Sequence, residues 1–214
     1  MRHGRRAIIW AVAALCLVGG EGAAAGASTA AQPAPVFART VVLAPLTGIV
    51  RIQLPGGYPG FVRLSGRRAV PVGTVVDTTA GTVGLTSANP APGGTQAGEF
   101  FRGIFRLAQS RTSGGVVDLV IRDNVSEAVC GSGAAHDAAL SQRVLGLLRG
   151  VAKGRFRTVG RFAAASVRGT NWGVRDRCDG TLTVVRTGVV IVRDFRLKRN
   201  IVVRAGQTYL AKAP

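Results

Sequence analysis

Lysine and acidic residues are scarce in this chain of 214 residues. It has 10 Asp and Glu against 28 Lys and Arg, which gives a formal net charge of +18. Only Lys153, Lys198 and Lys212 are lysines, so arginine carries nearly all of the positive charge. A GC-rich genome would explain arginine in place of lysine, but it would not explain the shortage of acids. The imbalance therefore indicates an anionic neighbour.

Residues that could carry out catalysis or bind a metal are also few and scattered. Beyond His3 the chain has one histidine, His136, and Asp137 beside it would point elsewhere in a helix. Ser132 and Ser141 lie nearby, but no G-x-S-x-G motif surrounds them. No group of histidine, cysteine and carboxylate has metal-ligand spacing. We therefore expect no enzymatic activity, no metal-binding residues and no cofactor.

Apolar runs long enough to cross a membrane are lacking. The run from Ala7 to Gly20 has 14 residues, whereas a bilayer-spanning helix needs about 20. It follows a head with three arginines and precedes small residues up to Ala31, an order typical of a secretory signal peptide. We expect residues 1–31 to be removed on export to the cell envelope, although an uncleaved anchor is the alternative. Their removal, with three arginines and one glutamate, lowers the formal net charge from +18 to +16.

Cysteine is limited to three residues, and Cys16 lies in the expected signal peptide. Cys130 and Cys178 remain, and an even pair in an exported chain predicts a disulfide. The loop of 47 intervening residues would gain roughly 4 kcal/mol from closure, as an upper value. Two unpaired buried thiols are the alternative.

Short runs rich in Val and Ile, separated by glycine, dominate the chain from residue 41 onward. Such runs are typical of strands joined by turns, and Asp179-Gly180 is a hairpin signal. We predict a linker at 32–40 and a single all-β domain over 41–214, without a transmembrane segment because charges interrupt each Val-rich run. Trp172 is expected in its core.

Residues 134–149 break the β pattern. Four apolar residues recur there at helical spacing, and Gly150 would end a helix. These apolar residues are Leu140, Val144, Leu147 and Leu148. The spacing predicts one short amphipathic helix near 134–149, inserted between the halves of the β structure.

Three short motifs in the last third of the chain carry a resemblance. They are V-R-G-T at Val167, Arg168, Gly169 and Thr170, then Gly188, then Ala205, Gly206 and Gln207. Their order resembles the FecR-like domain, best over 155–211 and more weakly over 46–86. The resemblance implies an extracytoplasmic β-roll or sandwich in which these motif residues are structural. Better-known relatives pass a ligand signal through a membrane helix to a sigma factor. No such helix is expected here, so the resemblance implies a stand-alone exported module.

Basic residues gather in two stretches that would suit an anionic partner. Arg149 and Arg161 flank the first stretch. In one continuous strand Lys153, Arg155 and Arg157 would share a face opposite Phe156. The second stretch lies at a strand-connecting loop, where side chains are free to reach a partner. The candidate partner-binding residues are Lys153, Arg155, Arg157, Arg193, Arg196, Lys198 and Arg199.

Two binding functions follow from these observations. The FecR-like resemblance implies a non-catalytic module that recognises an envelope protein or ligand in signalling or assembly. The positive charge instead favours an arginine-rich structural or adhesive domain that binds anionic cell-wall or surface polymers. Export and the lack of a nucleic-acid-reading motif argue against a nucleic-acid partner. Salt separates the two functions, because counter-ion-driven binding fades with salt.

Overall fold

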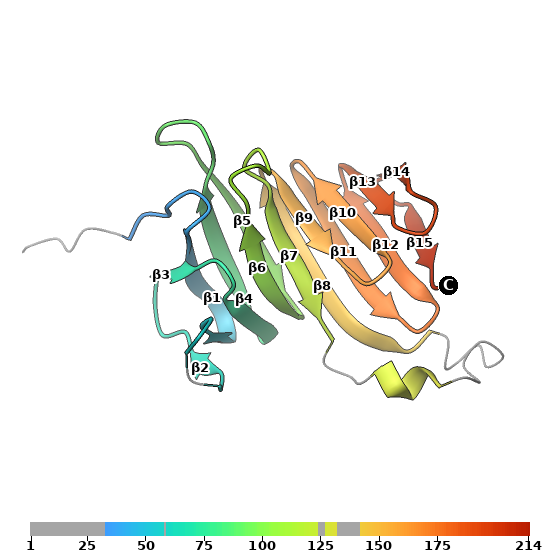
Figure 1. Cartoon of the computed structure of the whole chain (residues 1–214), viewed down its shortest axis with the longest axis horizontal. Coiled ribbons are helices and arrows are strands. Elements are labelled where there is room, and N and C mark those ends of the chain that lie inside the picture. The colour runs from blue at the N-terminus through green and yellow to red at the C-terminus, as the bar shows by residue number, and fades with distance from the viewer. Residues whose placement is uncertain (1–32, 58, 124–126, 132–141) are drawn as a thin grey trace, which may run out of the picture. The chain divides into compact units, whose positions relative to one another are not determined.

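The computed structural model describes residues 33–57, 59–123, 127–131 and 142–214, and β-strands dominate them (Figure 1). The expected signal peptide, 1–31, lies outside this part of the chain. The prediction of an all-β fold is confirmed. The first seven strands are β1 (Thr40–Gln53), β2 (Val62–Arg63), β3 (Arg68–Pro71), β4 (Val75–Ala88), β5 (Thr95–Phe101), β6 (Ile104–Gln109) and β7 (Val117–Arg122). A 3-10 turn, η1 (Glu127–Cys130), follows, and then come β8 (Val144–Lys153), β9 (Phe156–Val159), β10 (Ala163–Val167), β11 (Thr170–Arg177), β12 (Gly180–Thr187), β13 (Val189–Asp194), β14 (Arg199–Arg204) and β15 (Thr208–Lys212).

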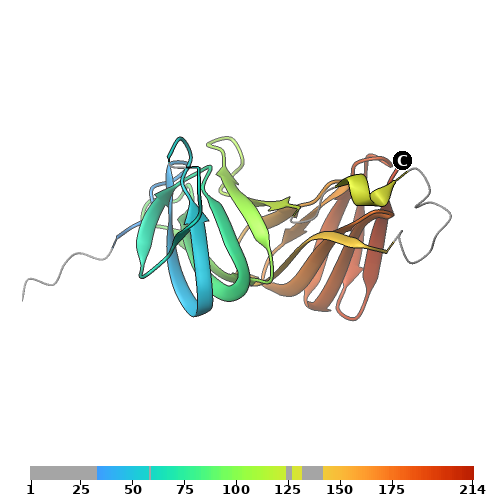
Figure 2. The same cartoon turned by 90° about the horizontal axis from the view of Figure 1, so that it is seen from below.

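The strands form two layers that share β1 and β4. Residues 75–77 of β4 pair with β6, whereas residues 82–88 pair with β5. From β4, one layer continues through β6, β7, β9, β10 and β13 to β14, and the other through β5, β8, β11 and β12 to β15. The β7–β9 pair is parallel. Both views place the strands before residue 110 at one end and those after 170 at the other (Figures 1 and 2).

A pair of glycines lets β1 and β4 pass from one layer to the other. Gly48 and Gly81 face each other across the two strands, between two register shifts of β1. A Cβ on Gly48 would lie 2.2 Å from the Ala80 carbonyl oxygen, and one on Gly81 2.6 Å from that of Thr47. Gly48 also has a φ of +64°, in the left-handed region that favours glycine. This corner therefore requires glycine on both strands.

Aromatic rings from both layers meet around Phe100 in the core. The Phe100 ring centroid lies 5.4 Å from that of Phe156, 6.0 Å from that of Phe105 and 6.1 Å from that of Trp172. Trp172 is buried, as expected, and its Nε1 donates to Thr158 Oγ1 at 3.0 Å, from β11 to β9 in the opposite layer. The buried indole nitrogen is thus satisfied, and the bond links the two layers.

Gly150 makes this ring cluster sterically feasible. It is the cross-strand partner of Phe100 on one side and of Trp172 on the other. A Cβ at Gly150 would lie 2.9 Å from the Phe100 ring and 3.0 Å from Trp172 Cη2. The two large side chains therefore occupy the space that a side chain on the central strand would fill.

The predicted helix near 134–149 is wrong where the structure describes it, and residues 134–141 lie outside that part. Val144–Arg149 belong to strand β8, which pairs with β11 and, further along, with β5. A register shift opposite Asp176 and Arg177 leaves Leu145 without a partner. This bulge brings Leu145 and Gly146 both to buried positions. The bulge breaks strict alternation, so the apolar spacing imitates a helix.

Cys130 and Cys178 form a disulfide with a Cα–Cα distance of 5.3 Å, which confirms the predicted pairing. Cys130 ends η1 in the connection between β7 and β8, and Cys178 follows β11. The bond therefore attaches this connection to the end of β11. No helix in the described ranges is long and apolar enough to cross a membrane.

We expect Gly150→Ala to lower the free energy of unfolding by about 1–3 kcal/mol, because the added methyl must displace two buried rings. Gly66→Ala is the matched control, since an added Cβ there meets nothing within 4 Å. It should not destabilise the protein. Urea denaturation measures both variants, and equal stability of the two would contradict the assigned packing.

Reduction of the disulfide should lower the free energy of unfolding by up to about 4 kcal/mol, through the entropy of the opened loop. The double variant Cys130→Ser/Cys178→Ser should be as stable as the reduced wild type, and its stability should not change when reductant is added. Thermal melts with and without reductant make the comparison. A wild-type melting temperature that does not respond to reductant would refute a stabilising role for the bond.

Candidate functional site

The few carboxylates of the described chain are largely engaged by the protein itself. Asp118 accepts two hydrogen bonds from Arg157, from Nε at 2.6 Å and Nη2 at 2.7 Å. This contact raises the pKa of the Arg157 guanidinium. Arg177 and Asp179 form a second bidentate pair. Two looser ion pairs, Arg51–Asp77 at 3.8 Å and Arg161–Asp123 at 4.0 Å, complete the set.

Two further carboxylates are buried and hold turns in place. Asp176 accepts from the Arg161 backbone N–H at 3.0 Å and from the Thr181 hydroxyl, and its burial raises its pKa. Asp194 accepts from the Leu197 N–H at 2.7 Å and from the Tyr209 hydroxyl at 2.8 Å. Burial opposes ionisation of Asp194, but these hydrogen bonds outweigh it and lower its pKa. Both carboxylates are thus engaged by neighbouring groups of the protein, and the positive charge of Arg196 also lowers the pKa of Asp194.

The structure brings together four of the sequence-predicted cations at the β13–β14 hairpin. We call Arg193, Arg196, Lys198 and Arg199 the hairpin cluster. Arg193 and Arg199 lie in the two paired strands, and the other two lie in the turn between them. All four are exposed, and Asp194 fixes the turn from the buried side. Phe195 and Leu197, also exposed, lie between these cations.

The other three predicted cations do not share one strand face, so that prediction is wrong. Lys153 ends β8, Gly154 turns the chain with a φ of +132°, and β9 begins only at Phe156. Lys153 and Arg157 therefore lie in different layers, and Arg157 is engaged by Asp118. Arg155 donates to the Gly114 carbonyl oxygen at 2.6 Å. The sequence alternation spans a turn rather than a strand.

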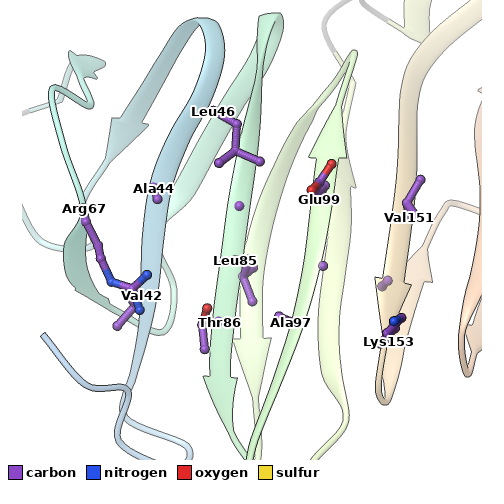
Figure 3. Close-up of a pocket in the computed structure, with 13 residues that line it drawn as sticks. Val42, Ala44, Leu46, Arg67, Leu85, Thr86, Ala97, Glu99, Val151 and Lys153 are labelled. Carbon is purple, nitrogen blue, oxygen red and sulfur yellow. The ribbon is translucent and has the colours of Figure 1, made fainter. Parts of the chain in front are cut away.

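Lys153 lines a groove of about 400 Å³ across β1, β4, β5 and β8 (Figure 3). Small side chains such as Ala44 and Ala97 line it, together with the exposed Leu46 and Val151. Arg67 and Glu99 are its other charged residues. The groove is therefore mostly apolar, and it places Lys153 away from the hairpin cluster.

The three segments of the FecR-like resemblance meet at one corner of the fold. Gly169 turns the chain from β10 to β11 with a φ of +67°, beside the exposed Arg168. A Cβ on Gly188 would lie 2.6 Å from Thr170 Cγ2, and the Gly188 carbonyl accepts from the Ala205 N–H at 3.0 Å. The Gly206 N–H donates to the Val185 carbonyl of β12, and the Val185 N–H donates to the Gln207 carbonyl. The buried Val167 ends β10 at the same corner, so this motif set forms turns between the layers.

A second arginine cluster was missed by sequence reasoning. Arg149 faces Gly173 across the β8–β11 pair, and Arg175 lies two residues further along β11. Arg186 of β12 lines the same small hollow of about 50 Å³, with Val184 and Trp172. Burial is the largest cause that lowers the pKa of Arg149. The pKa is lowered further by the positive charges of Arg102, Arg186 and Arg175. These residues are far apart in sequence, and only strand register brings them together.

The described residues contain no group of three or more histidine, cysteine and carboxylate side chains that could hold a metal ion. The predicted catalytic-type residues His136, Asp137, Ser132 and Ser141 lie outside the described part of the chain. The arrangement that the structure does present is cationic.

The raised pKa of Asp176 predicts a pH dependence of stability. The folded-state pKa lies above the unfolded value of about 3.8, so the folded state favours the protonated acid. That stabilisation is present below the unfolded pKa and is lost as pH rises through the folded pKa. The free energy of unfolding of wild type minus that of Asp176→Asn should thus decrease as pH rises from about 4. Urea denaturation of both proteins from pH 3 to 8 tests this, and a pH-independent difference would contradict it.

Comparison of the chain with protein-family models, curated proteins and solved structures gave no match. The FecR-like resemblance stays a prediction that rests on the motif residues of this sequence.

Proposed function

We propose that the chain is an exported, non-catalytic binding module that holds an anionic polymer of the cell wall or cell surface through its arginine side chains. The observation that carries this proposal is the use of the carboxylates. The acids of the four ion pairs and the buried Asp176 and Asp194 are engaged internally, and no ion pair in the described part of the chain uses a cation of the hairpin cluster. The disulfide is consistent with an extracytoplasmic location, where such bonds persist.

The hairpin cluster suits a long, flexible anion better than a compact one. Its four cations stand on two strands and the turn between them, and their side chains are exposed. Exposed charges attract a polyanion through many weak contacts, each screened by salt. Phe195 and Leu197 would add apolar contact with the polymer backbone at the same tip.

A second candidate is the recognition of an envelope protein by a FecR-like module, as the resemblance implies. One observation favours it. Val189, Ile191 and Val202 are exposed on β13 and β14, with Ile191 and Val202 as cross-strand partners. β14 ends one layer of the sheet, and an exposed apolar edge suits a protein partner. Such an interface would persist at high salt.

The test measures binding of the purified mature protein to envelope fractions of its own host over a series of salt concentrations. The variant Arg193→Gln/Arg196→Gln/Lys198→Gln/Arg199→Gln removes the hairpin cluster. Its slope of log Kd against log salt should be smaller than that of wild type by about 3, if all four cations contact the polymer.

The matched control removes four exposed arginines elsewhere, at Arg63, Arg67, Arg68 and Arg111. It should retain most of the wild-type slope. Equal losses in the two variants would contradict a role for the hairpin cluster. A single protein partner that is retained at high salt would contradict the polymer proposal and support the recognition module.

A further inference from the structure

The arginines around Gly173 form a more specific feature than the hairpin cluster, because they surround a small hollow. Arg149, Arg175 and Arg186 line this hollow of about 50 Å³ on the outer side of the β8, β11 and β12 strands. Arg102 follows Phe101, which is the cross-strand partner of Arg149 on β5. Three guanidinium groups from three strands thus line one place, and the charge of Arg102 also acts on Arg149. We call these four residues the arginine hollow.

Backbone geometry fixes the positions of two of these arginines. A Cβ on Gly173 would lie 3.3 Å from Arg149 Cγ and 3.9 Å from Arg149 Nε, so the Arg149 side chain lies across the bare glycine. Arg102 has a φ of +67°, a conformation that non-glycine residues rarely adopt. The Arg102 N–H donates to the Thr78 carbonyl at 2.9 Å, and the Thr78 N–H donates to the next residue, Gly103, at 2.8 Å. These bonds hold the turn that presents Arg102.

Within the part of the chain that the structure describes, no carboxylate forms an ion pair with these four arginines. The ion pairs there use Arg51, Arg157, Arg161 and Arg177 and none of the four arginines of the hollow. Burial and, to a smaller extent, the positive charges of the other three arginines lower the pKa of Arg149. Like charges held together in this way are stabilised by a bound anion.

We propose that the arginine hollow is a binding site for a phosphate group. Guanidinium groups bind phosphate oxygens through paired, charge-assisted hydrogen bonds, and several of them suit a multiply charged anion. The hollow exceeds the roughly 10–15 Å³ that one water requires, yet at about 50 Å³ it is small beside a typical ligand pocket. It would therefore take the phosphate alone, with the rest of the ligand outside. The phosphate belongs either to a small molecule or to a phosphodiester polymer.

The test uses isothermal titration calorimetry at low salt with three probes: inorganic phosphate, pyrophosphate and a glycerol phosphate oligomer. Wild type should bind one equivalent of at least one probe. Arg149→Gln/Arg175→Gln should weaken that binding at least tenfold, whereas Arg63→Gln/Arg111→Gln, which removes the same charge elsewhere, should change it less than twofold. Binding of the oligomer alone would assign the site to the polymer, and binding of the small anions alone to a small ligand; both support the site.

A thermal melt shows whether a loss of binding in the variant comes from a loss of folding. Without probe and at low salt, Arg149→Gln/Arg175→Gln should melt at the wild-type temperature or higher, because the substitutions relieve repulsion. Pyrophosphate should raise the melting temperature of wild type more than that of this variant. Equal affinity in the two double variants, or no saturable binding of any probe to wild type, would overturn the proposal. The hairpin-cluster variant should bind inorganic phosphate and pyrophosphate like wild type, so failure of the polymer proposal and failure of this one are distinguishable.

Discussion

The row Phe100–Gly150–Trp172 is the contact on which the rest of the structure depends. The three residues lie side by side on β5, β8 and β11, and the bare glycine leaves room for both rings. Because side chains alternate along a strand, the inward row fixes what faces outward. Phe101, Arg149 and Gly173 are consequently neighbours on the outer face. If the pairing of these strands shifted by one residue, the core rings would become exposed. The same shift would separate the arginines on the outer face.

The internal use of the carboxylates is the basis on which we propose an anionic partner. A protein with few acids has little means to neutralise arginine internally. Here Asp118, Asp179, Asp176 and Asp194 serve ion pairs, turns and strand ends. The ion pairs of the described chain use none of the arginines of the hairpin cluster or of the arginine hollow. Composition alone predicts an anionic neighbour, and these two groups of arginines are where we propose that it binds.

Local sequence signals predicted the features that depend on neighbouring residues. The Asp179-Gly180 turn joins β11 and β12, the Val-rich runs form strands, and the two cysteines pair. Prediction failed where a local pattern was ambiguous. The bulge at Leu145 made a strand look helical, and Gly154 divided an apparent strand between two layers. The arginine hollow could not be predicted, because Arg102, Arg149, Arg175 and Arg186 meet only through the register of strands far apart in sequence.

The side-chain Nε–Hε NMR spectrum of arginine-labelled protein, recorded with and without pyrophosphate, tests the central claim most directly. The claim is that carboxylates occupy one set of arginines and leave another set to bind anions. Arg157 and Arg177 should give protected signals that do not respond to pyrophosphate, since Asp118 and Asp179 hold them. The signals of Arg149 and Arg175 should shift and gain protection as pyrophosphate is added. Shifts at Arg157 and Arg177 instead, or a spectrum that pyrophosphate leaves unchanged, would contradict the account.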